Sequence, residues 1–147
     1  DIDYDIYAAG EAELGWLNAN ISIQAEVEFD LDLILTNLLQ QMVDEMHELG
    51  SEVAHLKVIG QAEGAYAVAN AISNDQPVQL SLASEHRTRF AELVVNARIA
   101  IPPETLEATF RKVLEYLANR NSLVVATTAL NCLKPGRPVP THRFNGD

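Results

Sequence analysis

A repeat inside the chain limits the folds that it can adopt. The segment EAELGWLNANISI (residues 11–23) returns as FAELVVNARIAI (residues 90–101), and the matching residues lie 78 or 79 positions apart. Each copy opens the same series of patterns, in which a strand-like segment precedes an amphipathic helix and a second strand-like run. A chain of 147 residues is long enough for one domain with a core and too short for two ordinary ones. We therefore expect two β-α-β halves folded into one domain.

The first half shows the clearest patterns. From Leu17 to Asp30 apolar and polar residues alternate, which is typical of a strand with one face in water. Asp30 is the expected N-cap of the following helix, and Gly50 is its expected stop. Residues 53–59 then form the second strand of this half. The apolar side of the first strand should carry Leu17, Ala19, Ile21, Ile23, Ala25, Val27 and Phe29.

The second half repeats this order. Pro102 and Pro103 open a helix at the place where proline is best tolerated, and residues 123–133 form the closing strand. Between the halves, two β-patterned runs flank the turn residues 74–76 and predict a β-hairpin. The helix should bury Leu106, Phe110, Val113 and Leu117.

These elements predict an α+β fold with the ferredoxin-like arrangement, a pseudo-twofold β-α-β repeat with an inserted β-hairpin. We expect an antiparallel sheet of about six strands with two helices on one face. The repeated strands should be adjacent, and the hairpin should extend the sheet beside residues 53–59. The single α+β domain is expected over residues 1–134, with its halves at about 12–59 and 90–133, the hairpin at 65–84 and a Pro-rich extended tail at 135–147.

Charge is unevenly distributed along the chain. The net charge is −11, and residues 1–63 hold 14 acidic residues against one lysine. Such a surface repels a phosphate backbone, so we expect no nucleic-acid partner. We also expect no membrane partner, because no apolar run is long enough to span a bilayer, and a cytoplasmic location, because there is one cysteine and no signal pattern. The acidic half is either a solvated surface or a docking surface for a basic partner.

Six polar side chains are expected on the sheet face that the helices leave open. This face is either an ordinary solvated surface or a shallow site for an anionic ligand or a partner segment. RNA-binding modules stack bases on aromatic residues of such a face, and here only Trp16 and Tyr66 are candidates. The six residues are Asn18, Asn20, His55, Lys57, Asn96 and Arg98.

The sequence lacks the motifs of the common catalytic sites. There is no phosphate-binding GxxxxGK[ST] or GxGxxG loop and no GxSxG nucleophile elbow. The four histidines never fall at the close spacings that place two imidazoles on one metal. Cys132 lies in an apolar strand pattern, which favours a small core residue over a nucleophile. We therefore expect no catalytic residue, no metal ligand and no cofactor in this chain.

The final segment, LKPGRPVPTHRFNGD, differs in kind from the rest. Its prolines favour an extended path that cannot continue the sheet. It is either a loosely ordered terminus or a strap held against the domain or a partner. The contacts of such a strap would come from Arg137, His142, Arg143 and Phe144.

Two short segments carry a resemblance to a known family. GWLNA at residues 15–19, preceded by EAEL, and PGRPVPTHR at residues 135–143 resemble the carboxy-terminal region of some bacterial CobW-like P-loop GTPases, often labelled cobalamin-synthesis proteins. In that family the GTPase half carries the P-loop and a cysteine-containing metal motif, and its members act as metal chaperones. Neither motif occurs in this sequence, so no GTP-binding or metal-binding residue is carried over.

The resemblance implies a non-catalytic accessory or regulatory domain of a metal-chaperone GTPase. Its partner would be the GTPase domain, in cis or in trans, or a client protein, and a homo-oligomer is compatible with that role. The alternative is a stand-alone ligand-binding protein or small enzyme that uses the polar open face of the sheet. The missing catalytic motifs favour the accessory role.

Overall fold

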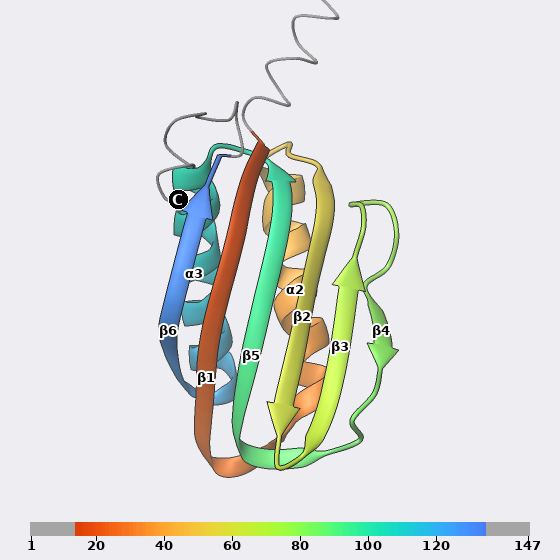
Figure 1. Cartoon of the computed structure of the whole chain (residues 1–147), viewed down its shortest axis with the longest axis vertical. Helices are drawn as coiled ribbons and strands as arrows, with labels where there is room; N and C mark the ends of the chain where they lie inside the picture. Colours follow the sequence, from red (N-terminus) through yellow and green to blue (C-terminus); the bar gives the residue numbers. More distant parts are fainter. Residues whose placement is uncertain (1–13, 135–147) are drawn as a thin grey trace, which may run out of the picture.

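The computed structural model describes residues 14–134 and shows one antiparallel six-stranded sheet with two helices packed on one face (Figure 1). The α+β fold predicted from the repeat is therefore confirmed. The tail contacts predicted at Arg137, His142, Arg143 and Phe144 lie outside the described residues. The elements are β1 (Leu14–Asp30), α2 (Leu31–Glu48), β2 (Val53–Ala62), β3 (Ala65–Ala71), β4 (Gln79–Leu82), β5 (Arg87–Ala100), α3 (Pro103–Asn121) and β6 (Val124–Leu133).

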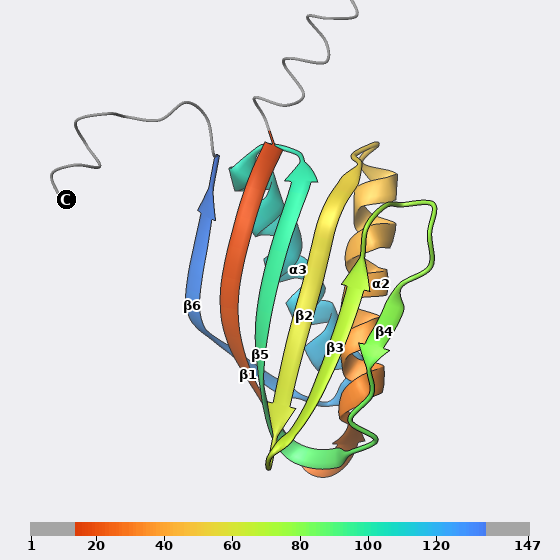
Figure 2. The same ribbon diagram turned by 45° about the vertical axis from the view of Figure 1, so that its right-hand side comes forward.

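The sheet order is β4-β3-β2-β5-β1-β6, and every neighbouring pair is antiparallel. The two strands that carry the repeat, β1 and β5, are hydrogen-bonded neighbours, as the repeat predicts. The equivalent asparagines Asn18 and Asn96 lie directly opposite each other. The β3–β4 hairpin extends the sheet beside β2, also as predicted, and both helices cover the same face (Figure 2).

The core lies between that face and the two helices. The side chain of Asp30 accepts a hydrogen bond from the backbone N–H of Leu33 at 3.2 Å and so caps α2. Gly50 follows the helix in the left-handed region with φ 70°, which agrees with its predicted role as a stop. The predicted apolar stripe of α3, Leu106, Phe110, Val113 and Leu117, is buried in full.

Two glycines allow the helix layer to approach the sheet closely. A Cβ built on Gly60 of β2 would lie 2.9 Å from a methyl carbon of Leu35 and 3.1 Å from one of Leu31. A Cβ on Gly15 of β1 would lie 2.7 Å from the backbone carbonyl oxygen of Ile101. Both positions therefore need glycine for lack of space rather than for backbone conformation, since neither has a positive φ.

The structure differs from the sequence prediction in two places. Val27 is not on the apolar side of β1 but 76% exposed, because the register of β1 against β5 shifts between Gln24 and Phe29. In addition, β2 and β3 are joined by a tight turn at Glu63 and Gly64, whose φ values of 51° and 83° fit the two-residue turn typical of hairpins. Three consecutive strands therefore form a meander, of which only the second hairpin was predicted.

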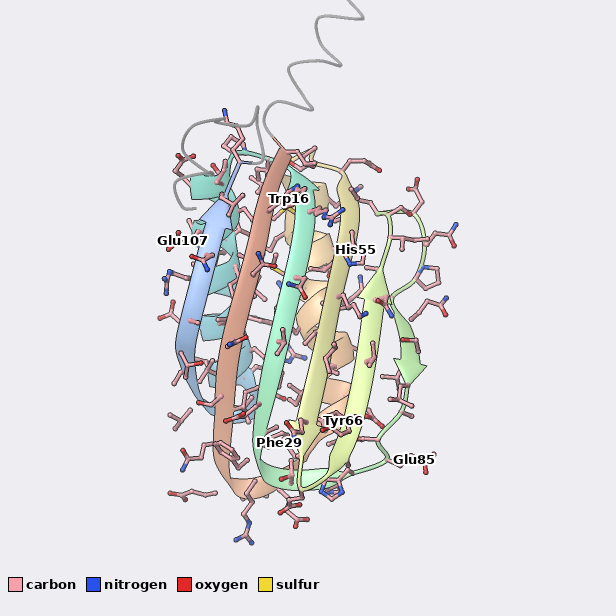
Figure 3. All side chains as sticks on the ribbon, viewed as in Figure 1. Trp16, Phe29, His55, Tyr66, Glu85 and Glu107 are labelled. Carbon is pink, nitrogen blue, oxygen red and sulfur yellow. The ribbon has the colours of Figure 1, made fainter. Side chains whose placement is uncertain are left out.

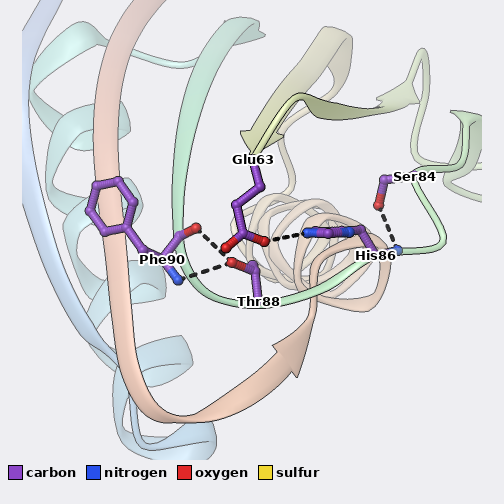
Figure 4. A network of polar contacts seen from close by, with 5 residues as sticks. All are labelled: Glu63, Ser84, His86, Thr88 and Phe90. Atoms are coloured by element: carbon purple, nitrogen blue, oxygen red, sulfur yellow. Dashed lines mark hydrogen bonds and ion pairs between the residues drawn. The ribbon is translucent and has the colours of Figure 1, made fainter.

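The loop between β4 and β5 is held against the start of α2. Asp32 accepts hydrogen bonds from the N–H and hydroxyl of Ser84, at 2.9 and 2.7 Å, and from the N–H of Glu85 at 2.8 Å. Burial alone would raise the pKa of Asp32, but these hydrogen bonds outweigh it and leave the pKa lowered. Figure 4 shows the neighbouring contact, in which His86 Nε2 lies 2.7 Å from Glu63 Oε1 and so links this loop to the β2–β3 turn.

Replacing a buried leucine of α2 should test the helix packing. Leu38 is fully buried, so Leu38→Ala should lower the free energy of unfolding by about 2–5 kcal/mol through lost burial and the cavity left behind. Leu33 on the same helix is 54% exposed, and Leu33→Ala should change the free energy of unfolding by only about 0.5 kcal/mol. Urea melts of both variants measure the difference, and equal effects would contradict the packing described.

Candidate functional site

The strand register brings the polar residues of the open face into two rows. In the first row, His55 of β2 lies opposite Arg98 of β5, and Arg98 lies opposite Trp16 of β1. In the second row, Lys57 lies opposite Asn96, which lies opposite Asn18. The two rows are adjacent because side chains two residues apart on a strand share one face. Figure 3 shows Trp16 and His55 near the same end of the sheet.

A shallow depression of about 350 Å³ lies over these two rows. Five of the six residues predicted for the open face line it. The sixth, Asn20, belongs to the next row, where it lies opposite Val94 and Ala129 and does not line the depression. The lining residues are Trp16, Asn18, His55, Lys57, Asn96, Ala97 and Arg98.

Arg98 lies over the indole ring of Trp16. Its guanidinium carbon is 4.4 Å from the ring centroid, a distance at which the cation is attracted by the π face. Such stacking fixes the plane of the guanidinium group and keeps its N–H donors directed outward from the ring edge. The indole Nε1 is itself buried and has no hydrogen-bond acceptor among residues 14–134.

The central asparagine pair is connected across the strands. Asn96 Nδ2 donates a hydrogen bond to Asn18 Oδ1, so the only carbonyl oxygen of the Asn18 side chain is engaged. The two N–H groups of the Asn18 amide are not used in this bond and can be donated to a ligand. This pair joins the two repeated strands at equivalent positions, and both asparagines line the depression.

The surroundings of His55 favour its uncharged form. Burial lowers its pKa, and the positive charges of Arg98 and Lys57 lower it further. Both effects favour the neutral imidazole. An anion bound among these three side chains would offset the charges of Arg98 and Lys57. It would therefore raise the pKa of His55 and favour the protonated ring.

The depression thus offers positive charge and hydrogen-bond donors. Arg98, Lys57 and His55 line it, and no aspartate or glutamate does. Neither Arg98 nor Lys57 forms an ion pair within the described part of the chain. This arrangement contrasts with the net charge of −11 on the whole chain. It can bind a carboxylate, a phosphate or another oxyanion by charge-assisted hydrogen bonds.

Trp16 lines the site, although the sequence indicated it only as an aromatic candidate for base stacking and not among the six predicted residues. The signal was present, because Trp16 precedes Asn18 by two residues and so shares its face once the strand is extended to Leu14. Asn131 of β6 also lies opposite Asn18, but it does not line the depression. Its position depends on the β1–β6 register, which contains a bulge and cannot be read from alternation alone.

A larger depression of about 560 Å³ lies at the opposite end of β1, beside the end of α3. Its lining includes the exposed apolar side chains of Val27 and Val124, and Glu26 is its one charged residue. We favour the smaller depression as the functional site. Several convergent polar groups distinguish a binding site better than volume does.

The other candidate residues offer little chemistry. Burial and the nearby carboxylate of Glu107 raise the pKa of Cys132, whose thiol donates a hydrogen bond to the carbonyl oxygen of Pro103 at 3.1 Å. This protonated thiol is a poor nucleophile. Within residues 14–134 no three His, Cys, Asp or Glu side chains gather closely enough to hold a metal ion.

No family model, curated protein or solved structure matches the chain. In the part that the structure describes, neither helix is sufficiently long and apolar to cross a bilayer.

The electrostatics of the depression can be tested through His55. Arg98→Ala and Lys57→Ala should each raise the pKa of His55, because each removes a positive charge that disfavours the imidazolium. NMR titration of the imidazole resonances measures the shift. Arg120→Ala, on α3, is the control and should leave the pKa unchanged. An unchanged pKa in both site variants would contradict the arrangement.

Proposed function

We propose that this chain is a binding domain that holds an anionic group of a ligand or partner on the open face of its sheet. The observation that carries the proposal is the depression lined by Arg98, Lys57 and His55 without a facing carboxylate. A protein with an overall negative charge gains no general attraction for anions, so a local cluster of cations points to local recognition.

The geometry favours binding over simple solvation of the face. Arg98 is oriented by Trp16, and Asn18 is oriented by Asn96, so the two kinds of donor are held before a ligand arrives. Lys57 and His55 are half-buried, where charge interactions are screened less than in open water. A carboxylate or phosphate oxygen placed between the two rows would meet donors from three strands.

The partner that best fits the sequence is a GTPase. The resemblance to the carboxy-terminal region of CobW-like proteins supports a non-catalytic accessory or regulatory role, with the GTPase domain in cis or in trans, or a client protein, presenting the acidic group. In that role the anion site would be a docking point for an acidic side chain of the partner.

The alternative is a stand-alone ligand-binding protein or small enzyme that uses the same face. One feature favours it, namely that burial and two neighbouring cations lower the pKa of His55 and so favour its neutral form. A neutral imidazole beside cations can accept a proton from a bound acid. No second group suited to complete such a reaction lines the depression, so binding remains the better-supported function.

Anion binding should be measurable with simple probes. Sulfate and acetate, titrated into the 147-residue chain, should shift the NMR signals of His55 and of the Trp16 indole N–H. Arg98→Ala should weaken binding about tenfold or more, because a charge-assisted hydrogen bond is lost. Sulfate keeps its charge over the whole range, and its affinity should rise as pH falls from about 7.5 to about 5.5, since protonated His55 adds a third cation.

Two comparisons make this result specific. Arg120→Ala removes an arginine of α3, outside the depression, and should leave both titrations unchanged. The ratio of sulfate to acetate affinity separates a phosphate-like ligand from a carboxylate. Shifts spread evenly over the surface and insensitive to Arg98→Ala would contradict the proposed site.

The accessory role has a test of its own. Because the chain has no phosphate-binding loop, it should not hydrolyse GTP, and it should show no preference for GTP over ATP. Calorimetry and a phosphate-release assay measure both. GTP binding at about micromolar Kd that survives Arg98→Ala would contradict the accessory role while leaving the anion site untouched.

A further inference from the structure

The two edges of the sheet differ in how well they are protected. At one edge, β6 runs over Val124–Leu133, and within the described residues its only strand neighbour is β1. Its sequence, VVATTALNCL, contains no charged residue and no proline. Soluble proteins usually protect an exposed edge with charges, prolines or shortness, because its free backbone groups can pair with another strand.

The other edge has these protections. Strand β4 is four residues long, follows Pro77, and pairs with β3 at three positions interrupted by a register shift. The loop after it is fixed to α2 through Asp32. The β4 edge is therefore short and interrupted, whereas the β6 edge is long and suited to pairing.

We propose that β6 is a dimerisation edge, which pairs antiparallel with β6 of a second copy of this chain about a twofold axis. The inference is independent of the proposed anion site. In such an antiparallel interface a residue beside the twofold axis lies near its own symmetry mate, so a charge there would meet the same charge of the second copy. Strand β6 carries no charge at any position, so a second copy can pair with it without that repulsion.

The bulge in β6 is compatible with this pairing. The register of β6 against β1 shifts at Thr128, whose hydroxyl donates to the backbone oxygen of Asn20 at 3.1 Å. The bulge separates two straight runs, residues 124–127 and 129–133. If the twofold axis lies beside Thr128, residues 124–127 of one copy pair with residues 129–133 of the other. The bulges of the two copies then lie together at the axis.

The position of α3 supports a second copy as the occupant. This helix packs against both β6 and β1, so its axis lies over the line between them (Figure 1). If the sheet continues into the second copy at a strand spacing of about 4.8 Å, the axes of the two α3 helices lie two spacings apart, at about 9.6 Å. Packed helices lie about 8–10 Å apart, so strand pairing and helix packing are satisfied by one arrangement.

The side of α3 beside β6 also complements itself. A shallow groove of about 270 Å³ runs between this helix and the strand, lined by Arg111, Leu114, Glu115, Ala118, Val125 and Thr127. Arg111, Glu115 and Ala118 follow helical spacing along one stripe. In an antiparallel helix pair, Arg111 of one copy lies opposite Glu115 of the other, and the twofold axis produces this contact twice. Ala118 on the same stripe can add an apolar contact, whereas Leu114 is buried in the core of its own copy.

Sedimentation velocity of the 147-residue chain tests the dimer. The chain should sediment as a dimer at about 100 μM, and Ala129→Lys should weaken dimerisation about tenfold or more by placing two lysines close to the axis. Gln79→Lys adds the same charge to β4, at the other edge, and should leave the dimer intact. Circular dichroism melts show that both variants fold.

A charge exchange on α3 makes the test specific for this geometry. Arg111→Glu and Glu115→Arg should each weaken the homodimer, because each places like charges opposite one another. Mixing the two variants should restore dimers, since each then meets an opposite charge in its partner. Dimers can re-form in the mixture only if the two chains contact each other through these residues. The effect of either substitution on its own α3 would not restore them.

Two outcomes would overturn the proposal. One is a chain that remains monomeric at about 100 μM. The other is a dimer that Ala129→Lys leaves unchanged or that Gln79→Lys disrupts equally, because the interface would then lie elsewhere.

Discussion

The pairing of β1 with β5 is the contact on which the rest of the structure depends. These are the two strands of the internal repeat, and they run opposite each other from Leu14 and Ala100 to Gln24 and Phe90. Strands β2, β3 and β4 extend the sheet on the β5 side of this pair and β6 extends it on the β1 side, while α2 packs mainly on β2 and β3 and α3 packs on β1 and β6. Because a strand presents alternate residues to opposite faces, the same register builds the core on one side and the polar rows on the other.

That register links stability and function. Shifting β1 by one residue would move Leu17 and Ile21 into water and Asn18 into the core, so the apolar face fixes where Asn18 meets Asn96. The anion site is thus positioned by the burial behind it rather than by contacts of its own. Its cations come from two neighbouring strands, β2 and β5, while Trp16 and Asn18 come from the third.

The two proposed surfaces are separate but compatible. The anion site lies over β1, β5 and β2, whereas the proposed dimer forms along the edge of β6. Continuing the sheet through β6 would leave both open faces on the same side, with one anion site in each copy. A partner carrying two acidic segments would then bind with an effective concentration set by the dimer, a gain that requires no new contact.

Local signals determined much of this fold from the sequence alone. The alternation in β1, the cap at Asp30 and the glycine at position 50 depend on neighbouring residues only, so they could be read directly. The open-face residues followed from the same alternation, and five of the six meet in one depression.

Tertiary structure decided the rest. The exposure of Val27 and the place of Asn131 depend on bulges, and the contact of Trp16 with Arg98 depends on pairing between strands about 80 residues apart. The open edge at β6 likewise appears only once all strands of the described sheet are placed. A strand is an edge because it lacks a neighbour on one side, and no local sequence pattern encodes that.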